Sequence, residues 1–204
     1  MTDMTASPAT TEKTLLQSIE EMAAGAPEDG YTLREILDRL DESAFGAGLF
    51  LLALPCCIPF LYGVPQVVSL PMMALAAQMA MGREQPWLPE ALANRKINRE
   101  GLANTAKGGR KWLGWIETFT KPRLTVITGP RSEQIVGLAL CLFCASILVP
   151  LPMTNTVPGF AVALAAFGLM HKDGVLVISG LLAGTLWIFG LVTAVAMGIT
   201  TLVS

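Results

Sequence analysis

Charged side chains are scarce in this sequence of 204 residues, where lysine, arginine, aspartate and glutamate together make up 15%. Soluble domains carry roughly 25% of these residues. Apolar residues reach 52%, and the mean hydropathy is +0.55. This shortage of charge excludes an ordinary soluble domain, and we predict an integral membrane protein.

Histidine and the motifs of common enzymes are also missing. His171 is the only histidine, so a Ser-His-Asp triad or a histidine-rich metal centre has almost nothing to use. The sequence contains no P-loop and no paired carboxylates of the glycosyl-transfer type. The cysteines lie in apolar runs, where packing explains them better than a disulfide framework or a soft-metal site; they are Cys56, Cys57, Cys141 and Cys144. We therefore predict a protein that is not an enzyme and that needs no metal or other cofactor.

A cleavable signal peptide is not expected, because the first 40 residues are polar and acidic. Residues 1–45 contain 3 basic and 10 acidic residues, whereas residues 83–132 contain 10 basic and 4 acidic ones. Lysine and arginine are enriched in cytoplasmic loops of membrane proteins. We predict that the N-terminus and residues 83–132 lie on the cytoplasmic side and that nucleic acid is not a partner.

Charge and proline divide the chain into five predicted segments. They are acidic cytosolic N-terminal helices over 1–43, a first hairpin over 44–82, a basic cytoplasmic or interfacial connector over 83–132, a second hairpin over 133–173, and C-terminal membrane sequence over 174–204. The last segment forms either one long tilted helix or two pieces divided near Gly190. Within the first segment, Thr32-Leu33-Arg34-Glu35 is a capping box. The predicted fold is an all-α, polytopic membrane protein with two proline-broken helical hairpins and a small N-terminal cytosolic cap.

Clusters of proline interrupt both hairpins. Each proline removes a backbone donor and obstructs the helix before it. The predicted breaks are Pro55, Pro59 and Pro65 in the first hairpin and Pro150, Pro152 and Pro158 in the second. Each half is near or below the roughly 20 residues that span a bilayer, so the hairpins either cross and return or re-enter. Because broken backbone within lipid needs protein or a water-filled cavity around it, we predict a cavity between the hairpins.

An internal repeat relates the two hairpins. Ala74–Glu84 aligns without gaps with Ala163–Asp173, 89 residues later, and five of the eleven positions are identical. Both stretches end in a basic residue followed by an acidic one. Because both copies are expected to start and end on the cytoplasmic side, we predict a parallel internal repeat, an arrangement from which transporters are built.

Polar side chains at the breaks and at the hairpin ends are the candidate functional residues. Candidates for binding a substrate or ion are Asn155, Thr154, Thr156, Gln78 and Gln66, which offer amide and hydroxyl groups within apolar sequence. The same residues would also be explained if their side chains bonded the backbone groups freed by the prolines, or if they formed hydrogen bonds between helices. Candidates for a gate or an interfacial anchor are Arg83, Glu84, Arg123, Lys172 and Asp173. Those that end the hairpins either pair and anchor the hairpin ends or form a cytoplasmic gate that binds an anionic head group or relays protons, and Arg123 could bind a lipid phosphate.

Two further patterns concern lipids and partner chains. Trp112, Trp115, Ile116 and Phe119 share one helical face, which either lies in the membrane interface beside anionic lipids or packs on the protein itself. Gly180-Leu181-Leu182-Ala183-Gly184 offers a face of small residues that would also suit a homodimer.

Several of these motifs occur together in one known family. They are Leu54-Pro55, Ile58-Pro59, Gly82-Arg83, Pro86-Trp87-Leu88-Pro89, Asn155-Thr156-Val157-Pro158 and Lys172-Asp173-Gly174. In combination they resemble the ExoD exopolysaccharide-synthesis family of bacterial membrane proteins. The resemblance implies an inner (cytoplasmic) membrane protein connected with exopolysaccharide production. Lys172 stands where we expect the family to have arginine, and lysine lacks the planar fork of arginine.

Two functions are compatible with these observations. We expect a transporter or flippase-like protein that moves an ion or an anionic lipid-linked species through a cavity between the two hairpins. The alternative is a non-transporting scaffold that organises polysaccharide-synthesis enzymes through its basic connector. The lipid bilayer is the expected partner in either case.

Overall fold

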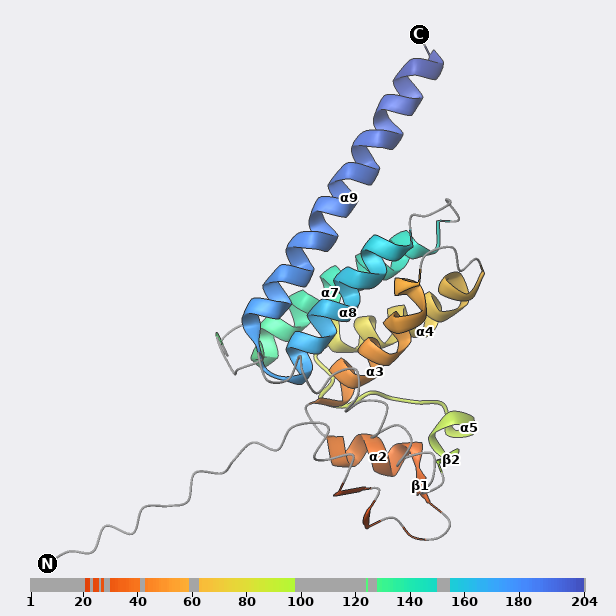
Figure 1. The fold of residues 1–204 in the computed structure, drawn as a ribbon, viewed down its shortest axis with the longest axis vertical. Helices are drawn as coiled ribbons and strands as arrows, with labels where there is room; N and C mark the ends of the chain where they lie inside the picture. The colour runs from red at the N-terminus through yellow and green to blue at the C-terminus, as the bar shows by residue number, and fades with distance from the viewer. Residues whose placement is uncertain are drawn as a thin grey trace, which may run out of the picture.

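A computed structural model of the chain is mostly α-helical (Figure 1). It describes residues 21–97 except 23, 26, 28–29, 41–42 and 59–62, and also residues 124, 128–149 and 155–203. The predicted interfacial helix over 112–119 lies outside the described residues, as do the first 20 residues of the predicted N-terminal segment.

The described elements are helices and one pair of short strands. In chain order the elements are β1 (Tyr31–Thr32), α2 (Leu33–Leu40), α3 (Ala44–Ala53), the 3₁₀-helix η2 (Leu54–Cys57), α4 (Val64–Ala80), α5 (Glu90–Ala93), β2 (Lys96–Ile97), α7 (Pro130–Ile147), α8 (Thr156–Met170) and α9 (Gly174–Val203). The two hairpins therefore correspond to α3–η2–α4 and to α7–α8. The C-terminal segment is one continuous helix that passes through Gly190 without a break.

Prolines set where several helices begin. At Leu54-Pro55 the α-helical turns of α3 give way to the tighter turns of η2. Pro65 and Pro158 lie in the first turns of α4 and α8, where a missing backbone N–H leaves no intrahelical bond unmade. Pro71, by contrast, lies inside α4 without ending it.

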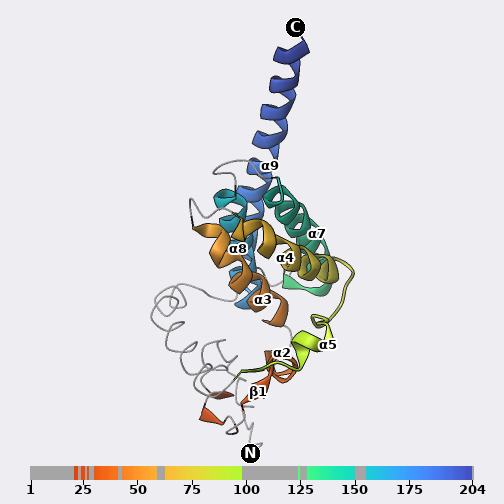
Figure 2. The same cartoon turned by 90° about the vertical axis from the view of Figure 1, so that its right-hand side faces the viewer.

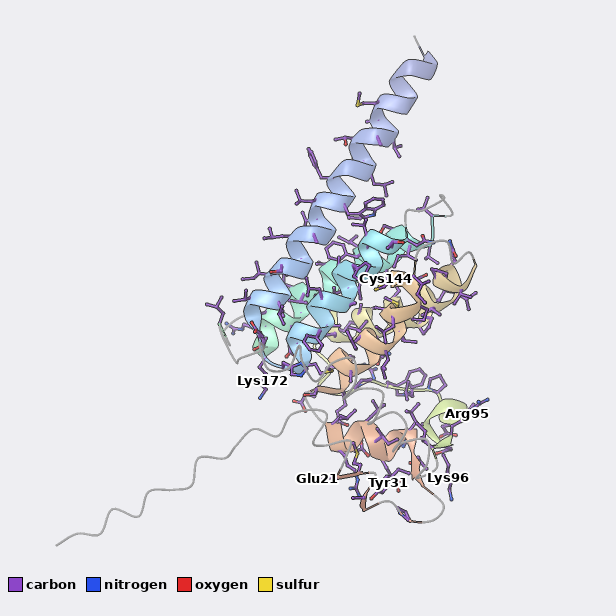
Figure 3. The ribbon with its side chains drawn as sticks, viewed as in Figure 1. Glu21, Tyr31, Arg95, Lys96, Cys144 and Lys172 are labelled. Carbon is purple, nitrogen blue, oxygen red and sulfur yellow. The ribbon has the colours of Figure 1, made fainter. Side chains whose placement is uncertain are left out.

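The N-terminal cap includes part of the predicted connector. β1 pairs antiparallel with β2, with Tyr31 opposite Ile97, and Figure 3 shows Tyr31 and Lys96 in this unit. Tyr31 packs in a small buried cluster with Met22 and Ile36, and the Arg39 guanidinium lies 4.3 Å from the centre of its ring. Residues on both sides of the first hairpin thus fold together at one end of the bundle.

The predicted capping box of α2 is confirmed. The Thr32 backbone N–H donates to Glu35 Oε2 at 2.7 Å, and the Glu35 N–H donates to Thr32 Oγ1 at 3.2 Å. The hydrogen bond from the Thr32 backbone holds the pKa of Glu35 below its usual value, and the Thr32 hydroxyl adds to this effect.

Acidification should therefore weaken the start of α2. Because the Glu35 pKa is lower in the folded state, its stabilisation is present above the unfolded pKa of about 4.3 and is lost as the pH falls through the folded value. Hydrogen exchange at the Thr32 amide should accelerate, relative to the intrinsic rate, between pH 5 and pH 3. In Glu35→Gln this extra acceleration should vanish, and its persistence there would assign the effect to another group.

Glycines let the two hairpins pair crosswise, α3 with α8 and α4 with α7 (Figure 2). A Cβ atom placed on Gly46 of α3 would lie 2.9 Å from the Ala166 carbonyl oxygen of α8. A Cβ atom on Gly137 of α7 would lie 2.6 Å from the Ala80 backbone nitrogen of α4. The backbones of these helices are therefore in direct contact, and each hairpin is held by the other.

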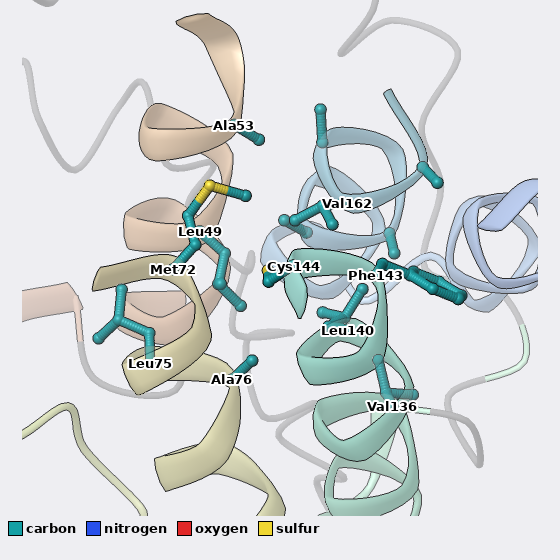
Figure 4. Packing of buried hydrophobic residues seen from close by; sticks show 14 of the residues in the cluster. Leu49, Ala53, Met72, Leu75, Ala76, Val136, Leu140, Phe143, Cys144 and Val162 are labelled. Carbon is teal, nitrogen blue, oxygen red and sulfur yellow. The ribbon is translucent and has the colours of Figure 1, made fainter. Parts of the chain in front are cut away.

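The core of this bundle is apolar (Figure 4). Figure 4 shows side chains from all four hairpin helices converging, among them Leu49, Met72, Leu140 and Val162, which are fully buried. α9 packs along α8, where a Cβ atom on Gly180 would lie 2.6 Å from the Ala165 nitrogen. The small-residue face that would suit a homodimer is thus occupied within the chain.

One helix is long and apolar enough to cross a membrane. This is Gly174–Met197 of α9, with a mean hydropathy of 2.3. α4 and α8 are apolar but shorter, with 17 and 15 residues. The pair Leu33–Leu40 and Ala44–Cys57 would pass only as a single span bent by 119°. By length and composition the described residues thus provide one membrane-capable helix, or two if the bent pair is counted.

Candidate functional site

The amino ends of α4 and α8 meet at η2. A Cβ atom on Gly159 of α8 would lie 2.8 Å from Cys56 Cβ, and Cys56 Sγ lies 4.0 Å from the Pro65 carbonyl oxygen of α4. The helix breaks of both hairpins therefore lie at the same end of the bundle. First-turn amides at helix starts lack intrahelical partners and carry a partial positive charge.

Two predicted binding residues, Asn155 and Gln66, are found at these amino ends. Asn155 precedes α8, is only 7% exposed, and makes no side-chain hydrogen bond to the helix that it begins. Among the described residues, Asn155 Oδ1 and Gln66 Oε1 are buried without a hydrogen-bond partner, and so is Trp187 Nε1. A buried polar atom without a partner lowers the stability of a fold by about 1–3 kcal/mol. Each of these atoms therefore either destabilises the bundle or is satisfied by a bound ligand.

Of the predicted residues not yet placed, the structure describes some and leaves others outside the described residues. Thr156 is half-buried in the first turn of α8, next to Asn155. Thr154, Arg123, Pro59, Pro150 and Pro152 lie outside the described residues.

At the opposite end of the bundle, α4 and α8 finish in the same way. The Met81, Gly82 and Arg83 amides donate to the carbonyls of Ala77, Met79 and Gln78, and the amides of His171, Lys172 and Asp173 donate to those of Phe167, Leu169 and Gly168. The two sets of bonds are 90 residues apart. Gly82 and Lys172 both have positive φ, +73° and +51°. The alignment at 89 residues is therefore shifted by one at this end, because Lys172 occupies the place of Gly82 and not that of Arg83.

Asp173 begins the next helix. It is 4% exposed, and its Oδ1 accepts the Val175 N–H at 3.0 Å, in the manner of a helix cap for α9. Lys172 is half-buried in the left-handed region, which costs a lysine roughly 1–2 kcal/mol relative to ordinary helix. Figure 3 shows Lys172 at the end of the bundle near the cap, whereas Cys144 lies within the bundle.

Gln78, predicted to bind a ligand or a neighbouring helix, holds the loop that follows α4. Its Oε1 accepts the Trp87 N–H at 2.6 Å, and its Nε2 donates to the Trp87 carbonyl at 3.3 Å. The sequence did not reveal this contact because Gln78 bonds the backbone of Trp87, and every residue except proline carries the same backbone groups. The loop is thereby fixed against the end of α4.

Removing this clamp should release the loop. Gln78→Met keeps the shape of the side chain but removes the acceptor of the Trp87 amide, at a cost of roughly 0.5–1.5 kcal/mol, because this hydrogen bond is exposed and water can replace it. Hydrogen exchange at the Trp87 amide should then accelerate about 2- to 10-fold. Gln85→Met, in the same loop and exposed, is the matched control and should leave this rate unchanged; an unchanged rate in Gln78→Met would contradict the assignment.

A pocket of about 290 Å³ opens between the cap and this loop. Arg34 of α2 and Arg83 face it, the second being a predicted gate or anchor residue, while Glu84 beside it is exposed. The other lining residues are Leu37, Asp38, Gln85, Pro86, Trp87, Leu88 and Ala93. Sequence reasoning assigned Arg34 and Trp87 to separate segments and therefore missed the site. The signal that could have indicated it is the run Pro86-Trp87-Leu88-Pro89 immediately after an apolar helix.

Metal binding finds no support in the part of the chain that the structure describes. No group of three or more histidine, cysteine, aspartate or glutamate side chains lies close enough together there to hold a metal ion. The four cysteines are all free thiols.

Comparison with known proteins identifies relatives along most of the chain. Residues 15–193 match the family described as "Exopolysaccharide synthesis, ExoD". The chain is 29% identical over 174 residues to Protein ExoD of Rhizobium meliloti (strain 1021), which covers 83% of this chain and 72% of that protein. It is 28% identical over 158 residues to an uncharacterized protein of Synechocystis sp., covering 76% of this chain and 74% of the relative. No solved structure matches the chain.

Proposed function

Because the chain belongs to the ExoD family, which is linked to exopolysaccharide synthesis, we propose that it is a transporter or flippase-like protein of the bacterial inner membrane. Its cargo is an ion or an anionic lipid-linked species. The observation that carries the proposal is the pair of buried amide oxygens, Asn155 Oδ1 and Gln66 Oε1, that have no hydrogen-bond partner among the described residues and lie at the amino ends of α8 and α4.

The lengths of the helices support a polytopic arrangement in which α9 spans and the hairpins re-enter. At about 1.5 Å per residue, α4, α7 and α8 measure about 26, 27 and 23 Å, less than the ~30 Å hydrocarbon core. The 30 residues of α9 measure about 45 Å, and Figure 1 shows this helix extending well past the bundle. Arg83 and Lys172 end the hairpins on the side of the cap, so we assign that side to the cytoplasm.

This orientation places the helix breaks deep in the bilayer, where unpaired polar atoms are most costly. Helix amino ends attract anions, because their free amides and dipoles are positive. The amide oxygens of Asn155 and Gln66 accept hydrogen bonds and so attract donors such as hydroxyl groups. A head group with both a phosphate and a sugar satisfies both demands, so an anionic lipid-linked sugar fits the site better than a simple ion.

Trp187 of α9 adds a donor at the same level. In the antiparallel pair, Gly168 of α8 faces Leu176 and Val177, and Gly180 of α9 faces Ala161 and Ala165. Continuing this register places Trp187 roughly opposite Asn155. Its partnerless indole N–H is thus suited to the phosphate or a ring oxygen of the same head group.

Transport requires the closed bundle to open. The glycine contacts of α3 with α8 and of α4 with α7 make these pairs the units most resistant to separation. Opening would therefore move the α3–α8 pair against the α4–α7 pair, which uncovers the amino ends of α4 and α8. A parallel internal repeat would supply the two equivalent halves of such a movement.

Flux in proteoliposomes tests the proposal. The purified protein is reconstituted with a fluorescent polyprenyl-phosphate glucose, and its movement is followed by quenching from outside; a second arm follows proton and potassium flux with entrapped dyes. Lipid movement faster than in empty vesicles supports the flippase. Ion flux without lipid movement would show that the cargo is an ion. Unchanged permeability in both arms, together with a co-purifying polysaccharide synthase, would favour the scaffold.

A further inference from the structure

The pocket between the cap and the loop after α4 is separate from the helix breaks. It lies at the opposite end of α4, where Arg83 follows the last turn. Two of its lining residues, Arg34 in α2 and Arg83, come from segments 49 residues apart in sequence. Only the folding of the cap against the bundle brings them to one cavity.

Hydrogen bonds within the loop after α4 fix one wall of this pocket. The Arg83 N–H donates to the Gln78 carbonyl at 3.2 Å, and the Gln78 side chain bonds both backbone groups of Trp87. Ala93 of α5 is buried behind the loop, and its N–H donates to the Pro89 carbonyl at 2.9 Å. A fixed wall loses little conformational entropy on binding.

The charged groups of the pocket suit a phosphate. Arginine presents a planar fork that binds phosphate oxygens through two parallel hydrogen bonds. Arg34 and Arg83 are both exposed, and neither makes an ion pair or a side-chain hydrogen bond to another described residue. Asp38, which also lines the pocket, reduces the positive charge and would repel an isolated phosphate.

The other polar and aromatic groups of the pocket suit a sugar, and this explains the presence of Asp38 beside the arginines. The Asp38 carboxylate can accept hydrogen bonds from hydroxyl groups, and the amide of Gln85, which also lines the pocket, can donate as well. Trp87 is 60% exposed and offers a flat indole face on which the apolar face of a sugar ring can lie. A volume of about 290 Å³ is at the lower end for small-molecule pockets and suits a single sugar with its phosphate.

We propose that this pocket binds a glycosyl phosphate, with Arg34 and Arg83 on the phosphate and with Asp38, Gln85 and Trp87 on the sugar. The ligand is either a free sugar phosphate or the head group of a lipid carrier. The site goes beyond the proposed transport and does not depend on it, because it shares no residue with the helix breaks. The plain alternative is a solvent-filled gap whose arginines only anchor the cap.

Calorimetric titration of the full chain in nanodiscs tests the site with three probes, glucose 1-phosphate, inorganic phosphate and glucose. Glucose 1-phosphate should bind more tightly than either part alone. Arg34→Gln and Arg83→Gln should each weaken it roughly 10- to 100-fold, the effect of losing hydrogen bonds to a charged group. Trp87→Ala should remove the preference over inorganic phosphate. Arg131→Gln, an exposed arginine of α7 outside the pocket, is the matched control and should bind as the parent does.

The outcomes separate the alternatives. Nanodiscs loaded with polyprenyl-phosphate glucose should bind glucose 1-phosphate less tightly if the lipid head group occupies the pocket. Without such competition, the ligand is the free sugar phosphate. The proposal is overturned if none of the probes binds, either alone or in competition with the loaded lipid. It is also overturned if Arg131→Gln loses as much affinity as Arg34→Gln and Arg83→Gln. Thermal melting confirms that each variant is folded. Because flux depends on Asn155 and binding on Arg34 and Arg83, either proposal can fail alone.

Discussion

Gly137→Ala should lower the free energy of unfolding by about 2–3 kcal/mol, a large share of the 5–15 kcal/mol typical of a folded protein. A Cβ atom at this position would lie 2.6 Å from the Ala80 nitrogen and 2.9 Å from the Ala76 oxygen. Both atoms belong to the backbone of α4 and cannot turn aside as a flexible side chain would. The α4–α7 pair must separate, and contacts along its whole length weaken. The melting temperature in detergent should fall by roughly 5–10 °C.

Gly190→Ala is the matched control for this prediction. It introduces the same methyl group into another helix, at a position with no heavy atom within 4 Å. Alanine favours helix over glycine by about 0.8–1 kcal/mol, so this variant should be as stable as the parent or more stable. Equal losses in the two variants would show that the backbone contact of Gly137 contributes nothing. Gly46→Ala should behave as Gly137→Ala does, since its Cβ would lie 2.9 Å from two backbone atoms of α8.

Asn155→Leu should have opposite effects on transport and on stability. The substitution removes a buried acceptor that has no partner, so the penalty of about 1–3 kcal/mol disappears and the protein should be as stable or more stable. Flux of the lipid-linked probe should fall at least 10-fold, since a hydrogen bond to a polar cargo is lost. Proteoliposome flux and thermal melting, measured on the same preparation, provide the two readouts.

The combination distinguishes a binding role from a structural one. If Asn155 only satisfied local backbone, its loss would lower stability and flux together. Thr193→Ala is the control, because Thr193 is an exposed polar residue of α9 that bonds only carbonyls of its own helix. It should leave both flux and melting unchanged. A fall in stability of Asn155→Leu comparable to the fall in flux would refute the site.

Local features of the fold could be predicted from the sequence because their causes are local. Thr32 and Glu35 are three residues apart, and their reciprocal hydrogen bonds need only one helical turn. Pro55, Pro65 and Pro158 act on the backbone of their immediate neighbours, so the helices change or start close to them. The uncharged stretch from Val175 onward indicated either one long apolar helix or two pieces divided near Gly190, and the structure has one helix.

The crosswise pairing of the hairpins could not be predicted in the same way. It depends on Gly46 meeting Ala166 and on Gly137 meeting Ala76, and many apolar helices with glycines would pack with similar energy. The sequence alignment of the repeat was also shifted by one residue at the helix ends. The alignment paired Arg83-Glu84 with Lys172-Asp173. The hydrogen bonds at the two helix ends instead put Lys172 in the place of Gly82.

The candidate site was predicted in part. Asn155 and Gln66 were singled out as polar residues within apolar sequence, and both have buried oxygens without partners. Gln78 satisfied the same criterion but bonds the Trp87 backbone nine residues away, which no pattern of side chains reveals. The pocket was missed because Arg34 and Arg83 meet only after the cap has folded onto the bundle.

The crosswise pairing also has a consequence during synthesis. Gly46 is translated 120 residues before Ala166, its neighbour in the finished bundle. At about 5–20 residues per second, the first hairpin waits roughly 6–24 s for the helix that completes it. Throughout that interval the apolar surface of the first hairpin lacks its final partner. In the membrane arrangement proposed above, the nascent chain should therefore depend on the insertion machinery for longer than a protein whose neighbouring helices pair in order of emergence.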